Sequence, residues 1–337
     1  MVESTELEEF DAWSLYIYAM KAPMTRDRYQ TTYTRLAKRP LIFRSFTGLT
    51  ISEFDFIYNE LESKYDEHER ARRLSKMNNR QRNMGAGKPF KLKVKERFLM
   101  LLVYYRLYIT YTLSGFLFDL DQSNVCRDIS IMEPLIKLCI PLPEKLYKRT
   151  RRLRTIDEVE EYFPGFKAFI DSSKQEIPRP KNKRRRKSYY SGKKKRHTVK
   201  TQFMVNSEGL ILHKTDHRKG RKHDYDVYKN NHPITPVQVE NVFDLGYFGV
   251  QNDFSTVKSV LPFRKKKNVV LSGEERTYKR KHSQLRMIVE HTICRIKKFG
   301  IMSGRFRNKL RKYDNISDIV SALLNFRIMI HTNRMSF

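Results

Sequence analysis

The spacing of hydrophobic positions changes after residue 140. Before it, apolar side chains recur every three or four residues, a period typical of amphipathic helices. After it, short alternating or fully apolar runs predict strands between helices. The predicted helices are 11–20, 26–38, 52–65, 95–108, 112–118, 123–132, 153–162, 224–231, 274–299 and 316–330, and the predicted strands are 166–171, 198–206, 210–215, 239–244 and 257–263.

The helical half of the chain contains a possible DNA reader. A long helix, a short helix, a turn at 119–122 and a third helix ending near Pro134 follow the layout of a helix-turn-helix. Ser123 is the expected amino-terminal cap, and Ser123, Asn124 and Arg127 would then face base edges from the start of the recognition helix. An ordinary helical bundle fits this segment equally well.

Composition and charge limit the classes of molecule that the protein is expected to bind. The 337 residues include 68 Lys and Arg against 37 Asp and Glu, a formal charge of +31, so a polyanion is expected and nucleic acid is favoured over an acidic membrane. The apolar stretch 99–118 is interrupted by Arg106 and is better explained as two buried helices than as a membrane span. Three unpaired cysteines and an acidic amino terminus favour a reducing interior without disulfides.

Three acidic residues stand in unusual surroundings. Asp171 ends an apolar run, Asp244 follows a short apolar strand, and Glu290 directly follows the apolar residues 287–289 of a long predicted helix. Converging carboxylates in a basic protein are typical of a site for hard ions such as Mg²⁺ or Mn²⁺, which prefer oxygen ligands. Taken singly, each acid is more simply a turn former, a helix cap or half of an ion pair.

The order of several motifs resembles the catalytic domain of insertion-sequence DDE transposases, in particular the insertion-sequence-five-like group with its amino-terminal helix-turn-helix. The motifs are Asp171, Ile177-Pro178-Arg179-Pro180, Tyr189 through His197, His223-Asp224, Asp244-Leu245-Gly246-Tyr247, and Arg286 through Val289-Glu290-His291 to Lys297. Two positions depart from the family: Ser172-Ser173-Lys174 replaces the common Gly-Thr-Glu, and Ser283 stands where a tyrosine is usual.

The resemblance implies a fold and a set of metal ligands. It implies an α/β (α+β) RNase H-like catalytic domain, with a mixed sheet flanked by helices, after an all-α helix-turn-helix domain. Asp171 would lie on the first core strand, Asp244 after the fourth and Glu290 on the following helix, together holding two Mg²⁺ or Mn²⁺ ions. The expected divisions are a helical appendage (1–40), a helical segment with a basic linker (41–92), the helix-turn-helix domain (93–145) and the catalytic domain (160–332) with a basic insertion (179–197).

Basic residues around these acids are expected to hold DNA. Arg286, Glu290 and Lys297 share one helix face by their spacing of four and seven, and the family uses the last as a DNA contact. A plain ion pair between Arg286 and Glu290 is the simpler alternative. The run Lys193, Lys194, Lys195, Arg196 and His197 combines cations with neighbouring aromatic rings and suits a DNA strand, although a solubilising or nuclear-localisation-like tract would look the same. His223, Asp224 and Tyr247 are accessory positions.

The expected function is a transposase that binds terminal inverted repeats of double-stranded DNA, cuts the strands and transfers them to target DNA. Such a protein would act as a homodimer or higher oligomer on DNA, in the cytoplasm or nucleoid of a prokaryotic cell, with no membrane and no small-molecule cofactor. One alternative is a domesticated or inactive derivative that only binds DNA. Another, a tyrosine recombinase, lacks a tyrosine after Tyr313 to serve as nucleophile, and zinc at His213, His217 and His223 is disfavoured by the surrounding cations.

Overall fold

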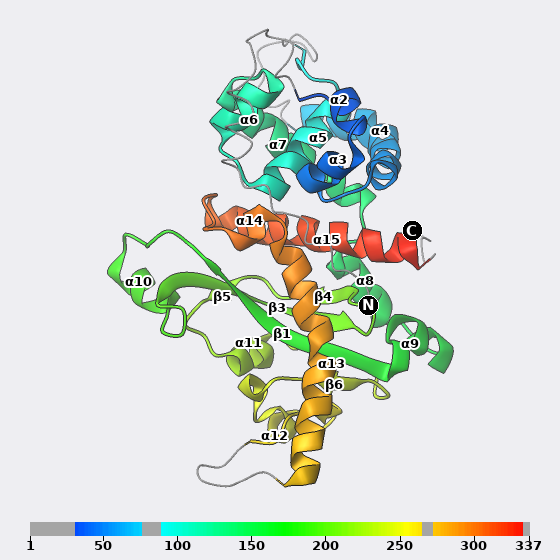
Figure 1. The fold of residues 1–337 in the computed structure, drawn as a ribbon, viewed down its shortest axis with the longest axis vertical. Coiled ribbons are helices and arrows are strands. Elements are labelled where there is room, and N and C mark those ends of the chain that lie inside the picture. Colours follow the sequence, from blue (N-terminus) through cyan, green and yellow to red (C-terminus); the bar gives the residue numbers. More distant parts are fainter. Residues whose placement is uncertain (1–30, 76–88, 265–271, 333–337) are drawn as a thin grey trace, which may run out of the picture. The chain divides into compact units, whose positions relative to one another are not determined.

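The computed structural model describes residues 31–75, 89–264 and 272–332 (Figure 1). The predicted helix at 11–20, the first five residues of the one at 26–38 and most of the basic linker lie outside these ranges. The chain forms two compact units, Met1–Leu135 and Ile136–Phe337. Each unit is described by itself.

The first unit is built entirely from helices in its described part. They are α2 (Tyr33–Ala37), α3 (Pro40–Thr47), α4 (Ile51–Leu74), α5 (Val94–Leu107), α6 (Tyr111–Phe118) and α7 (Gln122–Cys139), whose last turn enters the second unit. Helix α5 is the centre of the unit, because an unbroken run of its side chains from Arg97 to Tyr105 is buried. Phe54 of α4 stacks on Phe98 of α5 with ring centroids 4.6 Å apart.

The predicted helix, short helix, turn and helix are present as α5, α6 and α7. The turn is tight: a Cβ on Gly115 would come within 2.4 Å of the carbonyl oxygen of Leu120, and the αL residue Asp119 ends α6. The apolar stretch 99–118 is broken between α5 and α6, and no helix in the described ranges is both long and apolar enough to cross a membrane.

Two details of α7 differ from expectation. Asp121, not Ser123, caps the helix, because its carboxylate accepts the backbone N–H of Ser123 at 2.8 Å. The helix also continues through Pro134 to Cys139, so the predicted end at the proline is wrong. Leu135 and Ile136 are fully buried just beyond the proline, and this packing outweighs the hydrogen bond that proline cannot donate.

The second unit contains a mixed sheet. Its strands are β1 (Lys167–Glu176), β2 (Tyr190–Ser191), β3 (Arg196–Asn206), β4 (Ile211–Lys214), β5 (Arg218–Lys219), β6 (Glu240–Val242) and β7 (Ser259–Val260). The order is β2-β3-β1-β6-β7, with β4 and β5 also paired to β3. Strands β1 and β3 are antiparallel, whereas β6 pairs in parallel with both β1 and β7.

Strand β1, with 10 residues, extends five residues beyond the end of the predicted strand 166–171. Its polar second half, from Ser172 to Glu176, pairs residue by residue with β3, so Asp171 lies in the middle of a strand and not at its end. The predicted hairpin is confirmed as β3 and β4, joined through Gly209 at φ +83°. The basic insertion also has structure, since it contains helix α10 (Lys183–Tyr189) and β2.

Helices pack on this sheet. Helix α13 (Gly273–Lys297) crosses β1 and β3, as Figure 1 shows, and α15 (Tyr313–His331) packs on α8 (Pro143–Thr150) and β4. Ser272 and Glu275 form a capping box at the start of α13. The remaining elements are α9 (Ile156–Tyr162), η3 (Pro164–Phe166), α11 (Asp224–Asn230), η4 (Leu245–Tyr247), α12 (Val250–Asp253), α14 (Gly300–Ser303) and η5 (Leu310–Lys312).

The core of this unit lies between the sheet and its helices. Ile170 of β1, Met204 of β3, Phe243 after β6 and Tyr228 of α11 are fully buried in one cluster. A helical unit followed by a mixed sheet with flanking helices agrees with the fold that the family resemblance implies, and the strands between helices agree with the spacing of apolar residues.

Candidate active site

Three segments far apart in the sequence supply the predicted carboxylates. Asp171 comes from the middle of β1, Asp244 follows β6 and caps η4, and Glu290 lies on α13. Because β6 pairs in parallel with β1 and α13 crosses β1, the topology brings the three segments to one place.

All three carboxylates contact a single guanidinium, that of Arg286. Its Nη1 lies 3.0 Å from Oδ1 of Asp244, and its Nη2 lies 3.4 Å from Oδ2 of Asp171 and 3.3 Å from Oε1 of Glu290. Asp171 Oδ2 and Glu290 Oε1 both contact Nη2 of Arg286. The distance between these two oxygens is therefore no greater than the sum of their distances to that nitrogen. The simple helical ion pair considered for Arg286 and Glu290 therefore exists, but it is part of a four-residue cluster.

The carboxylates differ in exposure. The side chain of Asp171 is 21% exposed, whereas those of Asp244 and Glu290 are 44% and 52% exposed. Burial raises the pKa of Asp171 above its usual value, while the backbone N–H of Ser172 and the charge of Arg286 act in the opposite direction. The cluster is thus anchored at Asp171 and open to solvent at the other two acids.

The donor set suits a hard divalent ion, but Arg286 lies where such an ion would bind. As the side chains stand, no group of three or more His, Cys, Asp or Glu within the described ranges is arranged to hold a metal. The Nε of Arg286 is buried without a hydrogen-bond partner, which is a costly environment for a guanidinium. The three carboxylates surround a guanidinium whose Nε lacks a hydrogen-bond partner. If that guanidinium withdrew, the carboxylate oxygens would suit Mg²⁺ or Mn²⁺.

A second layer of contacts fixes the strands that carry the acids. The buried hydroxyl of Tyr247 lies 2.9 Å from Ser172 Oγ, joining η4 to the residue after Asp171. Burial raises the pKa of Tyr247 well above its usual value, so this hydroxyl keeps its proton. The accessory position Tyr247 therefore holds the Asp244 segment against β1.

Asp224, another accessory position, lies beside the cluster and is paired with Lys200. Lys200 Nζ lies 2.7 Å from Asp224 Oδ1, and its side chain is only 2% exposed. Sequence analysis missed Lys200, because its neighbours Thr198, Thr201 and Gln202 are polar and give no sign that the lysine is buried. His223 precedes α11 and is exposed.

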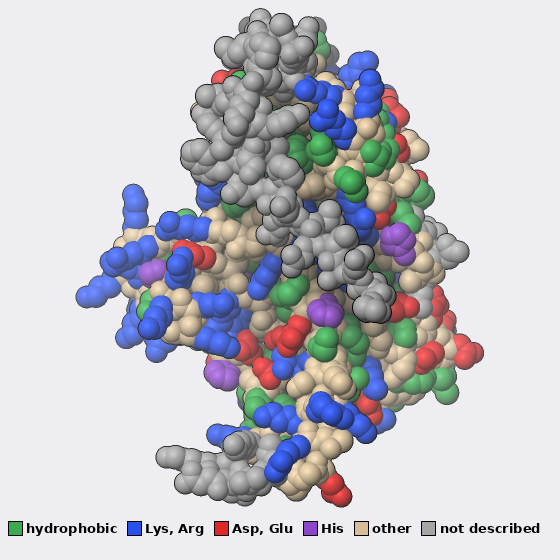
Figure 2. Space-filling model, in the orientation of Figure 1, with side chains coloured by type: hydrophobic (Ala, Val, Ile, Leu, Met, Phe, Trp, Pro, Cys, Tyr) green, Lys and Arg blue, Asp and Glu red, His purple; other side chains and the backbone are tan. Residues whose placement is uncertain are grey.

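The basic run predicted to hold DNA forms the tip of the β2–β3 hairpin. Lys193, Lys194, Lys195 and Arg196 are exposed, although Arg196 also pairs with Glu176 at 2.7 Å. His197 lies edge-on to Tyr190, with centroids 5.6 Å apart. Figure 2 shows Lys and Arg side chains gathered over the end of the sheet that carries α10, next to a group of acidic side chains beside α13.

Lys174 links this basic surface to the acids. It lies three residues after Asp171 on β1, about 10 Å along the strand, and donates to Ser191 Oγ at 3.1 Å. Burial and the neighbouring charges of Lys200, Lys193 and Lys194 lower its pKa. The strand that carries Asp171 is thus joined to the basic hairpin through Lys174 and Ser191.

The other predicted DNA contacts lie in separate places. Lys297 is exposed near the end of α13, two turns beyond Glu290. In the first unit Ser123 and Arg127 are exposed on α7, and Arg127 donates to Asn124 at 2.9 Å. Arg286, predicted as a DNA contact, is instead turned toward the acids.

The histidines considered for zinc do not converge. His213 packs edge-on against Tyr147, and burial lowers its pKa to about 4. His217 pairs with Asp314 at 2.7 Å. Each of these two is partly buried against a protein partner.

Three acids meeting on a mixed sheet, beside a strongly basic surface, are typical of nucleases that cut a phosphodiester backbone. Comparison with known proteins agrees. Residues 170–325 match the family described as DDE superfamily endonuclease, and residues 90–142 match the helix-turn-helix of DDE superfamily endonuclease. Both matches support a DDE transposase with an amino-terminal helix-turn-helix.

A curated relative supports this assignment. The chain is 28% identical over 248 residues to a probable transposase for insertion sequence element IS702 from Microchaete diplosiphon, covering 72% of this chain and 84% of the relative. No solved structure matches at the same level of significance.

Proposed function

We propose that this protein is an active transposase that binds the terminal inverted repeats of its element and cuts and transfers DNA strands at Asp171, Asp244 and Glu290. The observation that carries the proposal is the convergence of these three carboxylates on Arg286. In support of an RNase H-like domain, the sheet has an antiparallel β1, β3 and β4 on one side and the parallel β6 and β7 on the other.

The three carboxylates would hold two divalent ions, Mg²⁺ or Mn²⁺, which supply activation of the attacking oxygen and stabilisation of the leaving 3′ oxygen. The protein's own groups do the rest. Asp171, the least exposed acid, would fix the position of the site, and the more exposed Asp244 and Glu290 would complete the set of oxygen ligands. Arg286 holds the three acids together in the absence of ions, and with ions bound its guanidinium would be available to a DNA phosphate.

The DNA path follows from the charges. A backbone placed at the carboxylates and running toward the β2–β3 hairpin reaches the exposed Lys193, Lys194 and Lys195. Phosphates paired with these lysines would fix the register of the strand without reading its sequence. Reading of the terminal repeat belongs to α7, whose Ser123, Asn124 and Arg127 lie at its start.

Two ends of an element are cut in transposition, so we propose that the protein acts on DNA as a homodimer or larger assembly. We also propose that it resides with DNA in the cytoplasm or nucleoid, in keeping with its helix-turn-helix and its charge of +31.

The test is cleavage of a duplex that contains one element end, with Mg²⁺, with Mn²⁺ and with a chelator. We expect cuts only with a divalent ion, and loss of cutting by about a hundred- to thousandfold in Glu290→Ala, the size of effect seen when a transition-state charge stabiliser is removed. Glu161→Ala, an exposed acid on α9, is the matched control and should cut normally. Salt-sensitive binding without any cutting would favour the alternative, a transposase-derived DNA-binding protein.

A further inference from the structure

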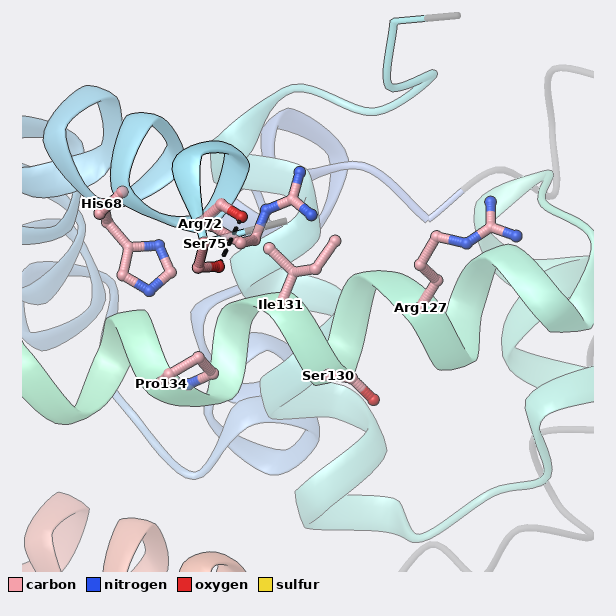
Figure 3. A pocket seen from close by; sticks show the side chains of 8 residues that line it. His68, Arg72, Ser75, Arg127, Ser130, Ile131 and Pro134 are labelled. Carbon is pink, nitrogen blue, oxygen red and sulfur yellow. Dashed lines mark hydrogen bonds between the residues drawn. The ribbon is translucent and has the colours of Figure 1, made fainter. Parts of the chain in front are cut away.

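Helices α4 and α7 of the first unit enclose a groove that the helix-turn-helix match does not account for. It is an open groove of about 610 Å³, lined by His68, Arg72 and Ser75 of α4 and by Arg127, Ser130 and Pro134 of α7, as Figure 3 shows. Helix α4 lies wholly outside residues 90–142, the segment that matches the family.

The groove runs along the exposed face of the recognition helix. Ser123, Arg127, Ser130 and Pro134 are all exposed and are separated by four, three and four residues, so they form one stripe on α7. The last three line the groove. A duplex that presents base edges to the start of this stripe must place a sugar-phosphate strand beside the helix, on the side where α4 lies.

The charge of the groove favours phosphate. Glu69 is almost buried and is paired with both Arg72 and Arg73, at 2.6 and 2.8 Å, so two cations face one anion. These hydrogen bonds lower the pKa of Glu69 to about 2 and hold both guanidinium groups in place. Arg72 uses Nε and Nη2 for Glu69, which leaves Nη1 for another acceptor. Among the described residues Arg127 donates a hydrogen bond to the neutral amide of Asn124, and its charge also acts on the carboxylates of Asp121 and Asp128.

We propose that this groove holds the sugar-phosphate backbone of the bound duplex, so that α4 is a second DNA-binding element beside the helix-turn-helix. The inference rests on the proposed DNA-reading role of α7. The guanidinium groups of Arg72 on α4 and Arg127 on α7 lie on the same side of α7 (Figure 3). Both can therefore bind phosphates of the same DNA strand. Contacts of this kind add affinity and fix the protein's position, and they carry no base specificity.

Ala71 offers a clean test, because it lines the groove, is exposed, and makes no polar contact through its side chain. Ala71→Glu places a carboxylate among the expected phosphates, and Ala71→Lys adds a cation there. Ser63→Glu and Ser63→Lys are the matched controls, since Ser63 is exposed on the same helix two turns earlier and does not line the groove. Circular dichroism of each full-length variant checks folding.

Binding is measured by fluorescence anisotropy over a series of salt concentrations, with an element-end duplex and a mixed-sequence duplex of equal length. We expect Ala71→Glu to weaken binding of both duplexes by about three- to tenfold, and Ala71→Lys to tighten it and steepen the dependence of log K on log salt by about one. Both Ser63 pairs should stay within about twofold of the unaltered protein.

Two outcomes overturn the proposal. One is that both Ala71 variants bind as the Ser63 controls do, and the other is that Glu and Lys at 71 weaken binding equally, which indicates a steric effect. These results differ from failure of the proposed function, in which the unaltered protein itself shows no salt-sensitive binding to either duplex.

Discussion

Removal of Arg286 should make the protein bind divalent ions more tightly. In Arg286→Ala three carboxylates lose the cation that lies 3.0 to 3.4 Å from each of them. At about 4 Å and in a water-like medium two unit charges repel by about 1 kcal/mol, so a divalent ion and a guanidinium repel by about 2 kcal/mol. Water is the right reference, because Asp244 and Glu290 are about half exposed. That energy corresponds to about thirtyfold in affinity.

The assay is a titration of Mn²⁺ into the full-length protein without DNA, followed by electron paramagnetic resonance of the free ion. Arg286→Ala should bind at least about tenfold more tightly than the unaltered protein. Arg286→Lys, which keeps the charge, should change affinity much less. Arg280→Ala, an exposed cation on the same helix, controls for loss of general positive charge and should have little effect. Equal or weaker Mn²⁺ binding in Arg286→Ala would refute competition between the guanidinium and the ion.

Three further predictions concern the parts that support the sites. Gly115→Ala should destabilise the first unit by about 1–3 kcal/mol in denaturant unfolding, because the new methyl group meets the carbonyl oxygen of Leu120. Glu69 has a pKa lowered to about 2, so the stability it provides is full above about pH 4.5 and is lost as pH falls toward 2; Glu69→Gln should flatten that part of the unfolding profile. Lys200→Met should cost roughly 1–3 kcal/mol in thermal unfolding, less than a fully buried pair, because its partner carboxylate is 34% exposed.

Each of these three predictions has a control variant or a result that would contradict it. Gly273→Ala adds a methyl group that meets nothing within 4 Å and should leave stability unchanged; equal loss in both glycine variants would exclude the tight turn as the cause. Glu62→Gln, an exposed acid on α4, should keep the acid-dependent loss that Glu69→Gln removes. If Lys200→Met unfolds at the same temperature as the unaltered protein, the ion pair of Lys200 and Asp224 makes no net contribution to the free energy of unfolding.

The carboxylates could be singled out from the sequence, but their surroundings could not. Asp171, Asp244 and Glu290 stand out because acids are rare within apolar runs, and the spacing of Arg286 and Glu290 put them on one helix face. Nothing in that spacing indicates that the Arg286 guanidinium also reaches Asp171 on β1. That contact depends on where α13 crosses the sheet, which is a matter of tertiary packing.

Errors in the predicted elements have similar causes. The second half of β1 is polar and gave no strand signal, yet β3 supplies it with hydrogen-bonded partners along its length. Helix α7 continues past Pro134 because buried residues follow it. Helix α3 was missed, since eight residues starting at a proline carry little periodic signal by themselves. The hairpin of β3 and β4, the helix α13 and the helix α15 were predicted because their apolar patterns are long.

The most direct test of the central claim is to let Fe²⁺ take the place of Mg²⁺ and to map where it cuts the polypeptide. With ascorbate and peroxide, a bound Fe²⁺ generates hydroxyl radicals that cleave the chain next to its ligands, and mass spectrometry locates the cuts. We predict cuts near Asp171, Asp244 and Glu290 together, all suppressed by excess Mg²⁺ and all lost in Asp171→Asn. Cuts confined to one of the three segments, or placed elsewhere in the chain, would contradict a shared metal site.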